Sequence, residues 1–217
     1  MTRPRALVSW SSGKDSAFAL HEARRELDVV GLVTTVTSAY QRVSMHGVRE
    51  VLLEQQAAAA GLPLYRVAIP APCTNEVYEQ ELLAVLSAAR VTHVVFGDLF
   101  LADIRGYREQ LLARVGLECV FPLWQRDTRA LAREMIDAGL RATLTCVDLA
   151  KLDAAFAGRA FDGALLADLP AHIDPCGENG EFHSFVTAGP MLGRSIDVRV
   201  GETVLRDGFG FADLMPA

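Results

Sequence analysis

Six consecutive residues, Ser11-Ser12-Gly13-Lys14-Asp15-Ser16, have the composition of a phosphate-binding turn. They follow the apolar segment 5–10 and precede a helical pattern, so they stand where a strand is followed by a helix. Gly13 permits a tight turn, the first amides of a helix favour an anion, and Lys14 can neutralise phosphate charge. The serine hydroxyls at 11, 12 and 16 can donate further hydrogen bonds.

The charged pair in this turn needs separate consideration. The chain contains only two lysines, Lys14 and Lys151, and uses arginine elsewhere, which favours a need for a compact ammonium at position 14. Asp15 is unusual beside phosphate and is predicted either to cap the helix or to contact magnesium. The alternative interpretation is an ordinary strand–turn–helix junction with a serine cap. We favour the phosphate site, with Lys14 and Asp15 as catalytic candidates.

The turn resembles the SGGxDS loop of the PP-loop ATP pyrophosphatases, in the adenine nucleotide alpha-hydrolase group. It lacks the GxxxxGK[ST] pattern of a Walker A loop, and Ser12 stands where the resembling motif commonly has glycine. The resemblance implies that residues 11–16 bind ATP with Mg²⁺ and that ATP is cleaved between its alpha and beta phosphates. Adenine is then expected near the end of the second strand, at Val33 and Thr34.

A second polar segment begins with Gly97-Asp98, at the end of a predicted buried strand. Ligands bind at this edge of open α/β sheets, and Asp98 could bind magnesium, ribose or a cationic substrate. Arg105 and Glu109 follow, four residues apart on one helix face. They are as well explained by a solvated ion pair as by a role in the site.

The third segment, residues 176–184, combines acidic, amide and imidazole side chains with two glycines. Such groups could bind ammonium, hold a metal or manage the protons of an attacking amine. The spacing is not a zinc signature. The alternative is a glycine-rich hairpin with solvated charges. The candidate residues are Glu178, Asn179, Gly180, Glu181 and His183.

Together the three segments resemble the diphthine–ammonia ligase family over residues 6–190. The resemblance implies an amide-forming reaction through an acyl adenylate. We expect residues 177–184 to fold over the carboxyl edge of the sheet near Asp98. Glu181 would contact the ammonium or amine and His183 would orient the reacting groups. The remaining substrate-binding candidates are Glu178, Asn179, Gly180 and Arg105, with His46 as a further one.

Strands and helices must alternate to position these segments. Apolar, β-branched runs predict strands at 5–10, 29–36, 64–69, 92–98 and 117–121, with helical patterns between them. This pattern predicts an open parallel five-stranded sheet with helices on both faces, HUP/Rossmann-like in the light of the resemblance. A smaller C-terminal α+β part should follow, with a helix capped by Asp127, a strand at 142–149 and short strands after His183. The expected domains are an ATP-binding domain, 1–125, and a substrate-side subdomain, 126–217, packed on it.

Composition excludes several classes of protein. Hydrophobic residues make up 51% of the 217 and charged residues 22%, so the chain is not disordered. No apolar run is long enough to cross a membrane. The net charge of −6 makes nucleic acid an unexpected partner. The four cysteines form no CxxC pair, which favours a reduced, cytoplasmic protein.

The leading hypothesis is therefore an ATP-dependent amide ligase acting on an unidentified carboxylate with ammonium or an amine. The strong preference for arginine is typical of a GC-rich genome and suggests a bacterial relative, whose acid would differ from diphthine. A PP-loop enzyme that modifies tRNA is the second hypothesis, and the missing CxxC pair argues against it. A non-catalytic nucleotide-binding module is the third, and the polar residues of 177–184 argue against that. A homo-oligomer stays open.

Overall fold

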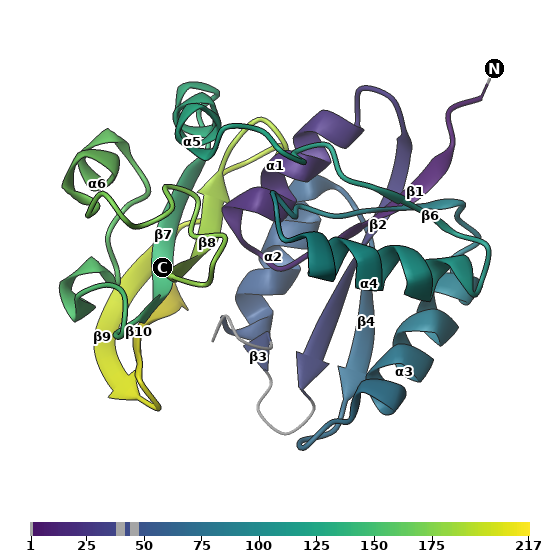
Figure 1. Cartoon of the computed structure of the whole chain (residues 1–217). Helices are drawn as coiled ribbons and strands as arrows, with labels where there is room; N and C mark the ends of the chain where they lie inside the picture. Colours follow the sequence, from purple (N-terminus) through teal and green to yellow (C-terminus); the bar gives the residue numbers. More distant parts are fainter. Residues whose placement is uncertain (1, 38–41, 44–47) are drawn as a thin grey trace.

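The computed structural model describes residues 2–37, 42–43 and 48–217 of the chain. The first half forms a sheet in which five strands run parallel, in the order β4-β2-β1-β5-β6 (Figure 1). A sixth strand, β3, pairs antiparallel with the end of β2. The strands are β1 (Arg5–Ser9), β2 (Asp28–Thr37), β3 (Arg42–Val43), β4 (Leu64–Ile69), β5 (His93–Val95) and β6 (Glu118–Val120). The predicted five-stranded parallel sheet is confirmed.

The order of the strands creates a crevice beside β1. The chain begins at the centre of the sheet, proceeds outward through β2 and β4, and then crosses back to β5 and β6 on the other side. Connections after β1 and β5 therefore diverge, which leaves a gap at the carboxyl ends of these two strands. Open α/β sheets bind their ligands at such a point.

Helices cover both faces of the parallel sheet, as the alternating pattern predicted. On one face α3 and α4 pack against Leu7, Val33 and Val94 in one apolar cluster. On the other face α1 and α2 belong to a larger cluster that also includes Ala6 and Val8 of β1. The helices are α1 (Lys14–Ala23), α2 (Glu50–Ala60), α3 (Asn75–Ala88) and α4 (Ala102–Ala113).

The second half of the chain forms an antiparallel four-stranded sheet in the order β8-β7-β10-β9. The tail, expected as short strands, instead pairs as a long hairpin of β9 and β10. Helix α5 begins after Asp127, whose carboxylate accepts a hydrogen bond from Ala130 N at 2.8 Å, as predicted. The elements are α5 (Thr128–Asp137), β7 (Arg141–Asp148), η1 (Ala154–Phe156), α6 (Gly163–Asp168), β8 (Phe182–Ala188), β9 (Val198–Arg206) and β10 (Phe209–Pro216).

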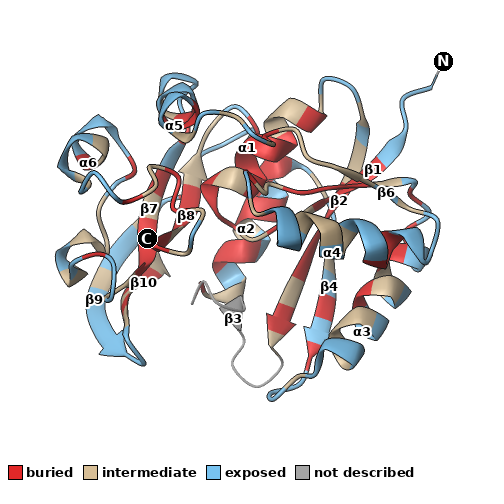
Figure 2. Cartoon of the chain, viewed as in Figure 1, coloured by how far each residue is buried: buried red, intermediate tan, exposed pale blue. Residues whose placement is uncertain are grey.

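Helices α1 and α2 lie between the two sheets and are covered on both sides. One buried apolar cluster includes residues of β1, α1, α2, β7 and β8, and Figure 2 shows α1 and α2 largely buried while α4 is more exposed. Arg49, before α2, pairs with Asp213 of β10 at 2.6 Å. The division at 125/126 stays a prediction, but the two halves share one core. In the described part of the chain, no helix is long and apolar enough to cross a membrane.

The shared core predicts that a cavity in the second sheet destabilises the whole chain. Phe185 of β8 is fully buried in the common cluster. Phe185→Ala should lower the free energy of unfolding by about 3–5 kcal/mol. Denaturant unfolding followed by tryptophan fluorescence and by far-UV circular dichroism should give one coincident transition, shifted by the same amount. Leu205→Ala on β9, where the side chain is 61% exposed, is the control and should change little. Two separate transitions would contradict the shared core.

Candidate active site

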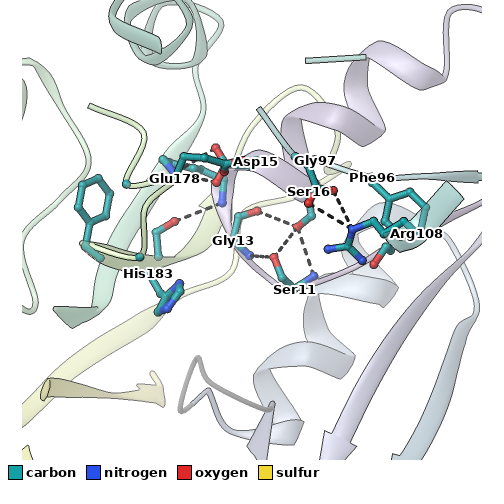
Figure 3. Close-up of a pocket in the computed structure, with 16 residues that line it drawn as sticks. Ser11, Gly13, Asp15, Ser16, Phe96, Gly97, Arg108, Glu178 and His183 are labelled. Atoms are coloured by element: carbon teal, nitrogen blue, oxygen red, sulfur yellow. Dashed lines mark hydrogen bonds and ion pairs between the residues drawn. The ribbon is translucent and has the colours of Figure 1, made fainter. Parts of the chain in front are cut away.

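A polar cavity of about 260 Å³ lies at the carboxyl ends of β1 and β5 (Figure 3). Three segments that are distant in the sequence form its walls: the turn before α1, the end of β5 with α4, and the loop before β8. The cavity therefore occupies the crevice that the strand order creates. Its lining residues are Ser9, Ser11, Gly13, Lys14, Asp15, Ser16, Phe96, Gly97, Asp98, Arg108, Gly177, Glu178, Gly180, Phe182, His183 and Ser184.

The turn at 11–16 is closed by its own hydroxyl groups. The Oγ atoms of Ser11 and Ser16 lie 3.0 Å apart, and Ser16 Oγ also lies 3.0 Å from the carbonyl oxygen of Gly13. Gly13 is the N-cap of α1 and has no side chain to cap the helix, and Ser184 Oγ accepts from the first helical amide, Lys14 N. The first turn of α1 therefore opens toward the cavity without a capping carboxylate, which suits an anion.

The backbone conformation of Ser12 explains why the SGGxDS loop commonly has glycine at this position. Its φ is +70°, in the left-handed region, where a side chain costs about 1 kcal/mol. The residue is fully buried, and its hydroxyl oxygen has no hydrogen-bond partner among the described atoms. Ser12 thus adopts the backbone geometry expected of the turn but does not reach the cavity.

Gly97 lets the end of β5 lie directly against the start of α1. A Cβ atom at this position would stand 2.7 Å from the carbonyl carbon of Asp15 and 2.8 Å from the amide nitrogen of Ser16. Backbone atoms cannot yield as a flexible side chain would. Glycine is therefore required here by a close approach, and this contact joins two walls of the cavity.

Lys14 places its ammonium inside the protein. The side chain is 3% exposed, and Nζ lies 2.8 and 3.0 Å from the carboxylate oxygens of Asp15. Nζ also donates to the carbonyl oxygen of Cys176. Burial opposes the charge on Lys14, but the Asp15 carboxylate attracts it, and the net result is a raised pKa. Lys14 therefore stays charged beneath the turn.

The carboxylate of Asp15 is bound to Lys14 and does not cap α1. Its two oxygens face Lys14, which corrects the expectation of a cap, because Gly13 is the N-cap. Across the described residues, no group of three histidine, cysteine, aspartate or glutamate side chains is arranged to hold a metal ion. A contact of Asp15 with a Mg²⁺ ion stays a prediction.

The loop 177–184 lies over the carboxyl edge of the sheet, as predicted. Glu178 Oε1 accepts a hydrogen bond from Leu99 N at 2.7 Å and a longer one from Phe100 N at 3.4 Å. Ser184 Oγ accepts from Lys14 N at 3.2 Å. The loop is thus fixed to both other walls, one residue beyond Asp98 and at the start of α1.

Glu178 and His183 have unusual protonation within this cavity. Burial, together with the negative charges of Asp15 and Asp98, raises the pKa of Glu178 to about 7, although two backbone amides oppose the shift. Burial and the nearby charge of Lys14 lower the pKa of His183 to about 4. At neutral pH Glu178 can therefore exchange a proton, whereas His183 is an uncharged imidazole.

Arg108 is a cavity residue that the sequence pattern did not identify. Its guanidinium lies over the ring of Phe96, 4.4 Å from the centroid, and Nε stands 3.1 Å from the carboxylate of Asp98. The predicted Arg105 lies outside the lining. Arg105 pairs with Glu109 at 2.7 Å and stacks on two aromatic rings, in keeping with the alternative of an ion pair outside the site. Both arginines lie on α4, and spacing alone does not distinguish them.

The structure does not bring Glu181 and Asn179 into the cavity. Glu181 is 3% exposed, and its Oε1 accepts from Asp174 N at 3.2 Å and from Asn179 Nδ2 at 3.1 Å. The carbonyl of Asn179 accepts from Lys151 Nζ at 2.8 Å. Glu181 faces inward because it directly precedes β8, whose first residue, Phe182, is buried. Its side chain holds the loop together, and Glu178 is the glutamate that faces the cavity.

The strand positions expected near adenine are buried in β2. Val33 and Thr34 are each 3% exposed and are not among the lining residues of the cavity. The carbonyl of Val33 accepts from Trp10 N at 2.7 Å. An adenine at this place stays a prediction. His46 lies outside the described residues.

Comparison with known proteins identifies relatives of both halves. Residues 4–119 match the family model described as the diphthamide synthase N-terminal domain, and residues 127–216 match the diphthamide synthase C-terminal domain. The diphthine–ammonia ligase of Homo sapiens is 28% identical, over 97% of this chain and 88% of the relative. That of Danio rerio is 32% identical, over 72% of this chain and 68% of the relative.

Among solved structures, a predicted subunit of tRNA methyltransferase from Methanocaldococcus jannaschii is similar at a TM-score of 0.46 and 15% identity. The match covers 89% of this chain and 100% of that one. A likeness of this size has no bearing on the reaction.

The raised pKa of Glu178 predicts how stability depends on pH. A carboxyl whose pKa is higher in the folded than in the unfolded protein lowers the free energy of unfolding as it ionises. The free energy of unfolding of the wild-type protein should therefore fall as pH rises from about 4.5 to about 7. Glu178→Gln keeps the acceptor oxygen and avoids the charge. The free energy of unfolding of Glu178→Gln minus that of wild type should therefore be larger at pH 8 than at pH 5. The expected increase is about 1–2 kcal/mol, because Glu178 is partly exposed to solvent.

Urea unfolding at each pH measures this difference. Glu202→Gln, which removes one exposed charge on β9, is the control and should stay parallel to wild type. A wild-type protein that gains stability over Glu178→Gln toward pH 8 would show that the cavity favours the carboxylate.

Proposed function

Since this chain belongs to the diphthamide synthase family and is an ATP-dependent amide ligase, we propose that it activates a carboxylate as an acyl adenylate and releases AMP and pyrophosphate. One observation carries the proposal: a single cavity joins the turn at 11–16 on one wall to Glu178, Asp98 and Arg108 on the others. Activation at the alpha phosphate and attack by nitrogen need such groups close together.

ATP would lie with its phosphates on the turn at 11–16. Ser11, Gly13 and Ser16 line this position at the N-terminus of α1, and the Lys14 charge lies beneath it. Helix N-termini and buried cations both stabilise phosphate charge. Mg²⁺ is proposed only as the ion that accompanies the nucleotide.

In the first half-reaction, a carboxylate oxygen of the acid attacks the alpha phosphorus of ATP. A new oxygen–phosphorus bond forms, the bond between the alpha phosphorus and its bridging oxygen breaks, and pyrophosphate leaves. Arg108 lies in the cavity with its position fixed by Asp98 and Phe96, and it would stabilise the negative charge that gathers at phosphorus. A planar guanidinium suits phosphate and carboxylate oxygens alike.

In the second half-reaction, the nitrogen of ammonia or an amine attacks the acyl carbon and AMP leaves. The nitrogen must lose a proton as the amide forms. Glu178 lines the cavity beside Asp15 and Asp98, and with a pKa of about 7 it is the carboxylate proposed to accept that proton. His183 is uncharged at neutral pH and would orient the reacting groups by hydrogen bonding. The names of the relatives make diphthine and ammonia the first substrates to try.

The reaction products test the class of chemistry. Incubation of the protein with ATP, ammonium chloride and a panel of carboxylates that includes diphthine should give AMP and pyrophosphate in equal amounts, with the amide. Glu178→Gln should slow amide formation by about 100-fold or more while ATP affinity stays near wild type. Glu181→Gln is the matched control and should retain more of the activity, since Glu181 lies outside the cavity lining. ADP and phosphate as main products would place the protein in another class.

Lys14 offers a test of the phosphate site that needs no acid substrate. Lys14→Ala removes the buried cation and leaves the Asp15 carboxylate uncompensated beside the phosphates, so ATP affinity should fall by about tenfold or more. Lys14→Arg should also weaken binding, because a planar fork does not fit the site of a compact ammonium between the Phe161 and Phe182 rings.

Isothermal titration with ATP measures both variants, after a thermal melt has shown that each is folded. Lys151→Ala, which removes the other lysine, is the control. Wild-type affinity in folded Lys14→Ala would remove the phosphates from this turn.

A further inference from the structure

Gln56 of α2 is a fully buried polar side chain that contacts the segment at residues 10–12 and strand β8. Its Oε1 accepts from Trp10 Nε1 at 2.9 Å. Its Nε2 donates to the carbonyl oxygen of Ser12 at 3.0 Å and to that of Val186 at 2.7 Å. The amide group thus uses both of its donor hydrogens and one acceptor position, which is a demanding arrangement inside an apolar cluster.

The Ser12 carbonyl is held from two directions. Besides Gln56 Nε2, the backbone N–H of Val186 in β8 donates to it at 3.0 Å. The carbonyl therefore points toward α2 and β8, away from the cavity. In a trans peptide the C=O and the next N–H point in opposite directions. The N–H of Gly13 accordingly points toward Ser11 Oγ, 3.4 Å away, on the side where Ser11 and Gly13 line the cavity (Figure 3).

This orientation decides which charge the turn presents. With the Ser12 carbonyl turned inward, the peptide offers its N–H to an anion. A flipped peptide would present the carbonyl oxygen to the phosphates and would repel them. Ser12 already has a positive φ, so its backbone conformation is not one that the residue prefers on its own. Something outside the turn must stabilise it.

We propose that Gln56 is a positioning residue that holds the Ser12–Gly13 peptide with its N–H toward the phosphates of ATP. The inference rests on the proposed function, because it takes the turn as the phosphate site. Gln56 acts through the backbone of the turn and does not touch the nucleotide. Trp10, immediately before the turn, is bonded to the same amide and reports on its state.

The first test is Gln56→Met, which keeps the length of the side chain and removes every hydrogen bond. ATP should bind with a dissociation constant raised by about tenfold or more, a loss of about 1.4 kcal/mol. Trp10→Phe is the matched control: it removes one bond to Gln56 but leaves both bonds to the carbonyls, so ATP affinity should stay within about twofold of wild type. Met135→Ala, in the core beside the second sheet, controls for general destabilisation.

The second test is Gln56→Glu, which also serves if Gln56→Met does not fold. An ionised carboxylate cannot donate to Ser12 or Val186 and repels both carbonyls, whereas the protonated form restores one donor. Burial favours the protonated form. ATP affinity relative to wild type at the same pH should therefore recover as pH falls from 8 to 6. A merely structural glutamine would lower stability in these variants without this pH-dependent recovery of binding.

Isothermal titration of ATP into each folded variant measures these effects. Folded variants that bind ATP as wild type does at every pH would overturn the inference alone. A wild-type protein that binds no ATP would overturn the proposed function and the inference together.

Discussion

The Lys14 ammonium connects the two parts of the molecule from which the cavity is built. It contacts Asp15 at the start of α1 and the carbonyl of Cys176 at the start of the loop before β8. A buried cation of this kind requires partners on every side, because an unpaired charge in the interior costs several kcal/mol. The position of the loop, and with it that of Glu178, is therefore coupled to the turn at 11–16.

The parallel sheet supplies the second constraint, which is steric. The turn after β1 and the end of β5 meet where the strand order reverses, and only glycine at 97 allows their backbones to approach so closely. The turn at 11–16, Asp98 and the loop 177–184 consequently lie around one cavity. The chemistry of the cavity depends on this crowding, since Asp15 and Asp98 both act on the protonation of Glu178.

The sequence predicted those features that local pattern controls. The β-branched runs gave the parallel strands, and the serines, glycine and lysine at 11–16 indicated the turn. The family resemblance predicted that 177–184 reaches the carboxyl edge. The direction of single side chains could not be predicted from the sequence. Glu178 and Glu181 are three residues apart in one loop, and Glu181 faces inward only because of the register of β8. Arg105 and Arg108 lie on the same helix, α4, but Arg105 contacts Trp124 whereas Arg108 contacts Asp98. Gln56 carries no signal in the sequence, because only the fold brings it to its partners, which are two backbone carbonyls and the Trp10 indole.

The position of α1 and α2 between two sheets also constrains biosynthesis. The surface that these helices bury against β7 and β8 belongs to strands that the ribosome makes only after residue 140. Until then the emerging first half has its parallel sheet covered on one face by α3 and α4, while the outer side of α1 and α2 remains bare to the solvent. Exposed apolar surface of this kind is what chaperones bind. The hydrogen bond from Val186 N that holds the Ser12 carbonyl can form only once residue 186 has been synthesised.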